Sequence, residues 1–182
     1  MLIFWIIVAV FVIFFFSSAI FTVEQQTTAV VERFGKFIRQ APAGLNFKIP
    51  LIERVAGRIS MRIRQLDVPV ETKTLDNVFV NVAVSVQFHV LEDKVYEAFY
   101  KLNDPERQIT SFVFDVVRAS VPTMKLDDVF EKKDQIANNV KAELSDTMEK
   151  FGYGIVKALV TDINPDAKVK AAMNEINEAS RL

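Results

Sequence analysis

The sequence contains no cysteine among its 182 residues, which excludes disulfide bonds, thiol catalysis and cysteine-ligated metal sites. It has a single histidine, His89, and five glycines. A zinc site would therefore have to rely on carboxylates, which is uncommon. A glycine-rich phosphate loop is also unsupported, because Gly152-Tyr153-Gly154 lacks the further glycine and the strand-to-helix context that such a loop needs. No serine sits in a nucleophile elbow. We expect no catalytic residue, no cofactor and no bound metal, and an enzyme is the weakest of the alternatives.

The amino terminus carries the longest apolar run. Eighteen of the twenty residues from Leu2 to Phe21 are apolar, and a helix of that length covers about 30 Å, the hydrocarbon thickness of a bilayer. This pattern predicts a single-pass transmembrane anchor over residues 1–22. The anchor residues would include Leu2, Trp5, Phe11, Phe16 and Phe21.

A cleaved signal peptide is the rival interpretation of the same stretch, and it would release the remainder as a secreted domain. Ser17-Ser18-Ala19 resembles a cleavage site, but no Lys or Arg precedes the apolar run, which is also longer than usual. An anchor is therefore favoured. The basic residues that follow it favour a cytoplasmic location for the rest of the chain.

Charge is unevenly distributed behind a net charge of only −1. From Glu32 to Arg64 there are eight basic and two acidic residues, whereas from Gln65 onward there are fourteen basic and twenty acidic residues. The basic segment lies next to the apolar run and has no alternating aromatics that would stack on bases, so nucleic acid is not an expected partner.

The basic segment could be a solvated face or could contact anionic lipid head groups. Nearby apolar residues could then enter the membrane interface, although ordinary core is an equally good interpretation of them. The candidate membrane-surface residues are Arg33, Lys36, Arg39, Phe47, Ile49, Leu51 and Ile52.

Periodicity separates a strand-rich part from a helix-rich part. Alternation from Val78 to Val90 is strict, and together with residues 58–74 it predicts an antiparallel hairpin with one buried face. Helical patterns follow at residues 92–102, at 105–121 and from Asp127 or Asp128 to Phe151. A strand is predicted over 155–163 and a final helix from 164. The fold class is α+β, an antiparallel sheet with helices packed on one face.

Several strings, in order along the chain, resemble the superfamily of stomatin, prohibitin, flotillin and HflK/HflC, known as SPFH or band 7. The resemblance is strongest to stomatin-like and hypersensitive-induced-reaction-like members. It rests on residues 23–26, 30–36, 43–50, 74–80, 119–122, 126–130, 151–155 and 161–165.

The resemblance implies an SPFH domain in two halves, 23–90 and 91–163, and the start of a coiled-coil helix at 164–182. It also implies a membrane scaffold subunit that assembles with itself into a ring or cage and organises a membrane microdomain. A regulatory subunit of a membrane protease or channel is the alternative. Basic and acidic surfaces could meet between subunits. The candidate interface residues are Arg58, Arg62, Arg64, Val169, Met173 and Ile176.

Overall fold

A computed structural model describes residues 1–167 and 169–172 of the chain. The contacts divide the chain into two compact units. Unit 1 comprises Met1–Arg62 and Val90–Lys101, and unit 2 comprises Ile63–His89 and Leu102–Leu182. Each unit therefore contains two separate stretches of sequence.

Unit 1 begins with α1 (Leu2–Ala19) and continues into two small antiparallel sheets. One sheet pairs β1 (Ile20–Val23) with β4 (Gly44–Phe47). The other has the order β3-β2-β5, with β2 at Thr27–Arg33, β3 at Lys36–Ala41 and β5 at Glu53–Ser60. A short 3-10 turn, η1 (Glu92–Lys94), and α2 (Val95–Tyr100) complete the unit.

A β-bulge shapes the sheet of unit 1. Val30 pairs with Gly57 and Val31 pairs with Val55, which leaves Ala56 as the extra residue on β5. Such an insertion bends the strand and increases its local twist. Gly57 then faces the ring of Phe99 from α2, at a place where a side chain would not fit.

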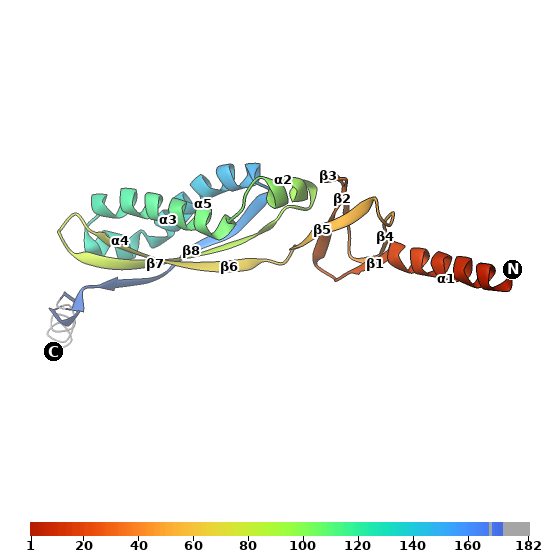
Figure 1. The fold of residues 1–182 in the computed structure, drawn as a ribbon. Coiled ribbons are helices and arrows are strands. Elements are labelled where there is room, and N and C mark those ends of the chain that lie inside the picture. The colour runs from red at the N-terminus through yellow and green to blue at the C-terminus, as the bar shows by residue number, and fades with distance from the viewer. Residues whose placement is uncertain (168, 173–182) are drawn as a thin grey trace. The chain divides into compact units, whose positions relative to one another are not determined.

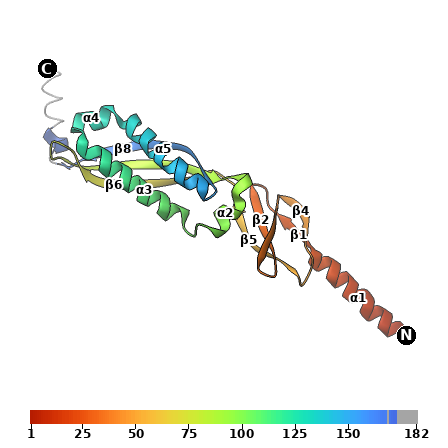
Figure 2. The same cartoon turned by 90° about the horizontal axis from the view of Figure 1, so that it is seen from above.

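Unit 2 is a three-stranded sheet with helices on one face. The strands β6 (Arg64–Lys73), β7 (Phe79–Val90) and β8 (Tyr153–Pro165) lie in the order β6-β7-β8. The helices are α3 (Pro105–Ser120), α4 (Leu126–Glu131) and α5 (Lys133–Lys150), with a 3-10 turn, η2 (Val121–Thr123), after α3. Figures 1 and 2 both show α3 and α5 running along the same face of this sheet.

The predicted hairpin is confirmed as β6 and β7, which pair antiparallel over ten residues from Arg64↔Phe88 to Lys73↔Phe79. Its first strand starts later than predicted, because residues 58–60 belong to β5. The alternating valines of β7 point into the core because successive side chains of a strand point to opposite faces. The helices α3 and α5 bury their apolar stripes in the same unit, where α3 contacts β6 and α5 contacts β8. The core of unit 2 includes Val80, Val82, Val84, Val86, Phe88, Ile109, Val113, Val117, Ile136, Val140, Leu144 and Met148.

The predicted transmembrane anchor over residues 1–22 is wrong. The helix ends at Ala19, and Ile20 and Phe21 enter β1, where they pair with Phe47 and Asn46. Among the residues that the structure describes, no helix combines the length and apolarity that crossing a bilayer requires. The predicted single-pass topology is therefore wrong as well, and the cytoplasmic side that was inferred from it loses its basis.

The last predicted helix is only partly described. The amides of Val169 and Lys170 both donate to the carbonyl of Asp166, so a helical turn starts there. Met173 and Ile176 lie outside the described residues, as does most of the predicted coiled-coil start.

Candidate functional site

Two turns at the same end of the β3-β2-β5 sheet present apolar side chains. Phe34 and Gly35 connect β2 to β3, with φ values of 50° and 80°. Positive φ at two successive residues is the signature of the tight hairpin turn that matches strand twist. Leu51 lies in the turn before β5 and has a φ of 70°. Both turns adjoin one cross-strand pair, Arg33↔Glu53, so they lie next to each other.

Glu53 holds both turns from inside. Its carboxylate accepts a hydrogen bond from Arg33 Nη2 at 2.7 Å and another from the Ile49 amide at 3.1 Å. The Glu53 amide in turn donates to the Ile49 carbonyl at 2.9 Å. The Arg33 hydrogen bond, followed by that from the Ile49 backbone, holds the pKa of Glu53 below its usual value of 4.5. Glu53 is therefore ionised and buried, with the partners that such a carboxylate requires.

Glu32 on β2 links α2 to the same sheet through hydrogen bonds. Its carboxylate accepts from Arg54 Nε at 2.9 Å and Nη2 at 2.7 Å, and from the Tyr100 hydroxyl at 2.6 Å. The Tyr100 and Arg54 hydrogen bonds lower the pKa of Glu32. Burial, together with the bond to Glu32, raises the pKa of Tyr100 to about 12. The aromatic rings of Phe37 and Tyr96 pack beside Tyr100.

An apolar surface continues from these turns to α1. The Lys48 amide donates to the Ala19 carbonyl at 2.7 Å, and Ile20 pairs with Phe47. The loop 48–52 therefore starts beside the end of α1. Exposed apolar side chains follow this path, and we define them as the apolar surface: Ile20, Phe34, Leu45, Phe47, Ile49, Leu51 and Ile52.

Basic residues border the apolar surface. Arg39 donates to the carbonyl of Phe47, and Lys36 and Lys48 have no acidic partner among the described residues. Arg33 and Arg54 are matched by the two buried carboxylates. The surplus charge here is therefore positive. An apolar surface with a positive border has the chemistry of a site that meets an anionic membrane interface.

Comparison with known proteins identifies the family of the chain. Residues 21–182 match the SPFH domain / Band 7 family model. The chain belongs to the SPFH family. Hypersensitive-induced response protein 4 of Arabidopsis thaliana is 48% identical over 161 residues, covering 88% of this chain and 55% of that protein.

Two further relatives widen the comparison. An uncharacterized protein of Methanocaldococcus jannaschii is 31% identical over 180 residues, covering 98% of this chain and 89% of that protein. The mitochondrial stomatin-like protein 2 of Rattus norvegicus is 28% identical over 166 residues, covering 91% of this chain and 46% of that protein. The SPFH chain thus spans about half the length of the plant and rat proteins that it resembles.

The structure brings most of the predicted membrane-surface residues of this SPFH chain to one end of unit 1. Arg33, Ile49 and Leu51 are joined through Glu53, and the loop 48–52 carries Ile52. Phe34 and the two buried carboxylates were not among the residues predicted from the sequence. The signal for Phe34 was available, because a large apolar residue before glycine at a hairpin tip is exposed by its position.

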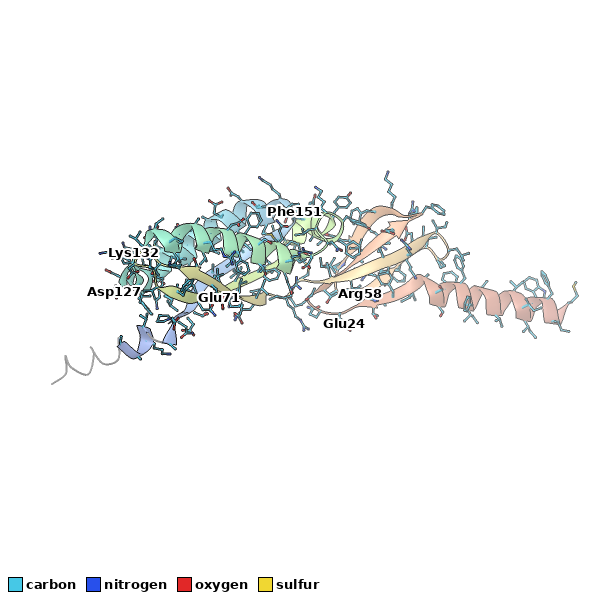
Figure 3. The ribbon with its side chains drawn as sticks, turned by 60° about the vertical axis from the view of Figure 1, so that its left-hand side comes forward. Glu24, Arg58, Glu71, Asp127, Lys132 and Phe151 are labelled. Atoms are coloured by element: carbon cyan, nitrogen blue, oxygen red, sulfur yellow. The ribbon has the colours of Figure 1, made fainter. Side chains whose placement is uncertain are left out.

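The predicted interface residues that the structure describes belong to both units. Arg58, labelled in Figure 3, lies on β5 and donates to the Thr22 carbonyl at 3.4 Å. Arg62 is exposed. Arg64 is used within unit 2, where it pairs with Glu106 at 3.3 Å and lies over the ring of Phe88 at 4.7 Å. Val169 is half-buried.

The residues that were predicted to form an anchor lie on or next to α1. Trp5 and Phe16 are exposed, and Phe21 is half-buried in β1. Nothing is described for the side chains of Leu2 and Phe11. Within the described ranges, no three His, Cys, Asp or Glu side chains gather closely enough to hold a metal ion.

Proposed function

We propose that this SPFH chain is a scaffold subunit that attaches peripherally to a membrane and assembles with further copies of itself to organise a microdomain. The observation that carries the proposal is the apolar surface of unit 1, which lies exposed beside unpaired lysines. Contiguous exposed apolar area is costly in water and marks an interaction site.

The positive border supports an anionic membrane as the partner. Each basic residue near such a surface contributes about 1 kcal/mol. Three of them, Lys36, Arg39 and Lys48, would contribute about 3 kcal/mol, or roughly a hundredfold in affinity. This attraction is screened by salt because exposed charges interact over about a Debye length.

Vesicle flotation tests the attachment. The full chain should float with phosphatidylcholine–phosphatidylserine vesicles. Replacing Lys36, Arg39 and Lys48 together by Glu should weaken binding by at least about a hundredfold.

A matched variant replaces three exposed lysines of unit 2, Lys133, Lys150 and Lys157, by Glu. It changes the net charge equally and should bind like the parent. Equal loss in both variants would show that only overall charge matters. No flotation of the parent would overturn the proposal.

Self-assembly is the second part of the proposal. The basic segment of unit 1 and the acidic excess after residue 65 offer two unlike surfaces, which suit a head-to-tail contact that closes into a ring. Because Arg64 is paired within unit 2, the test uses Arg58 and Arg62. Replacing both by Glu should lower the assembly mass measured at low salt by mass photometry. An unchanged mass would exclude pairing through these residues.

A further inference from the structure

Two residues stand out within the apolar surface. Outside the amino-terminal residues 1–19, Leu51 and Phe34 are the most exposed large apolar residues that the structure describes, at 94% and 82%. Both also have positive φ. The left-handed region is unfavourable for a large side chain, so residues kept there are held by their surroundings. The other two non-glycine residues with positive φ are Gln26 and Asn77, which are polar turn residues.

The Arg33–Glu53 pair lies at the base of two turns, that of Phe34 and that of Leu51, which we call the tips. Phe34 follows Arg33, and Leu51 is two residues before Glu53. Arg33 and Glu53 are paired across β2 and β5, and their side chains meet at 2.7 Å. The Glu53 carboxylate also closes the turn that carries Leu51, through the Ile49 amide. One buried carboxylate therefore fixes both turns relative to each other.

We propose that Phe34 and Leu51 form a two-residue wedge that enters the head-group and acyl boundary of one membrane leaflet. The Arg33–Glu53 pair is the positioning element that holds both side chains at a common depth. The inference deepens the proposed membrane attachment and rests on it.

A lipid leaflet fits this wedge better than a second protein does. Each tip is a short turn that presents one almost fully exposed side chain, whereas a protein interface core is a larger, closely packed and shape-complementary area. Lys36 and Lys48 flank the tips and match anionic head groups. The loop 48–52 also starts at the end of α1, most of whose described side chains are apolar and exposed. The apolar surface is thus continuous from α1 to the wedge.

Tryptophan quenching by brominated phospholipids tests the wedge. The native Trp5 is first replaced by Phe in the full chain, and Phe34→Trp and Leu51→Trp are then made separately. Phe79→Trp is the matched control, because Phe79 is an exposed aromatic residue at 63%, in unit 2. Vesicles contain phosphatidylserine and phosphatidylcholine brominated at defined acyl positions. Flotation of the same samples measures binding independently.

We expect strong quenching at positions 34 and 51, at the same depth, and none at 79. Flotation without quenching at 34 and 51 would overturn the wedge and leave the peripheral attachment standing. Failure to float would overturn both. A blue-shifted emission at 34 or 51 before vesicles are added would show that another copy covers the tips, and this too would overturn the wedge.

The positioning role is tested by Arg33→Met in each tryptophan variant. Loss of the Arg33–Glu53 ion pair should make the insertion depths of the tryptophans at positions 34 and 51 differ. A uniform loss of stability would not produce such a difference. Arg54→Met is the control, because it removes the neighbouring arginine partner, that of Glu32, and should leave both depths unchanged. Equal depths after Arg33→Met would exclude the positioning role, whereas parallel changes in both variants would assign it to sheet stability.

Discussion

The contact between Gly57 and Phe99 provides the sharpest test of how α2 is held on the sheet of unit 1. A Cβ built at Gly57 would lie 2.7 Å from both Cε2 and Cζ of Phe99. Real Cβ atoms do not approach other atoms so closely, so the ring must move in a Gly57→Ala variant. The Phe99 ring also packs edge-on against Tyr100, with centroids 4.9 Å apart.

Two opposing effects decide the size of the change. Overfilling a packed site costs about 1–3 kcal/mol. Replacing glycine by alanine also reduces the entropy of the unfolded chain, which stabilises by about 0.4–1 kcal/mol where the backbone is compatible. Gly57 has no positive φ. The net expectation for Gly57→Ala is a destabilisation of about 1 kcal/mol.

Phe99→Leu should reverse the sign of that effect. Leucine lacks the two ring atoms at 2.7 Å, while the nearest atom that it could retain corresponds to Cδ2, at 4.0 Å. In the Phe99→Leu background, Gly57→Ala should therefore stabilise the protein by about 0.4–1 kcal/mol. Phe114→Leu on α3 makes the same chemical change in unit 2, and Gly57→Ala should remain destabilising there.

The free energy of unfolding is measured by urea denaturation of the full chain in a mild non-ionic detergent. Near-ultraviolet circular dichroism follows Tyr96 and Tyr100, whose rings pack against Phe37 on the same surface. A double-mutant cycle isolates the coupling between the two substitutions. Equal destabilisation by Gly57→Ala in the parent and in Phe99→Leu would refute the steric explanation.

Three further outcomes follow from buried and capping groups. Leu144→Ala should cost unit 2 about 2–5 kcal/mol in thermal or urea unfolding, because Leu144 is fully buried on α5. Asp104→Ala should cost about 1 kcal/mol by removing the side chain that accepts from the Arg107 amide at 3.0 Å, whereas Asp104→Asn should retain most of that stability. Glu32 and Glu53 have folded pKa values below 4.5, so they stabilise unit 1 above that pH, and the stability is lost as pH falls through the lowered values. Glu53→Gln should accordingly flatten the acid side of the stability curve, and an unchanged slope would contradict the assignment.

Regular periodicity made much of the fold predictable. The alternation from Val78 to Val90 identified β7, and the helical pattern that ends at Phe151 identified α5, because burial on one face imposes a period of two or 3.6 residues. The buried face of α5 runs from Ile136 to Met148. The break between α4 and α5 at Lys132 was not visible, since no glycine or proline marks it. Lys132 has a φ of −100° and a ψ of 20°, and it separates two helices that each bury a face, at Val129 on α4 and at Ile136 on α5.

The candidate site shows a different limit. The basic and apolar residues could be picked out as a segment, but the roles of Glu32 and Glu53 depend on partners twenty or more positions away. Such pairs appear only once strand register is known. The predicted length of the amino-terminal helix was wrong for a related reason. Ile20 and Phe21 are as apolar as their neighbours, and it is their pairing with β4 that ends the helix.

The register of β2 and β5 is itself encoded in charge. Each strand carries the dipeptide Glu-Arg, at residues 32–33 and 53–54, and antiparallel pairing sets Glu32 against Arg54 and Arg33 against Glu53. A slip of one residue in either direction would oppose Glu32 to Glu53 or Arg33 to Arg54, and like charges directly opposite each other destabilise a sheet. Because successive side chains alternate, the two ion pairs of the correct register lie on opposite faces. One of them reaches Tyr100 of α2 and the other closes the turn of Leu51. The same four residues therefore fix the strand register, the docking of α2 and the position of the proposed wedge.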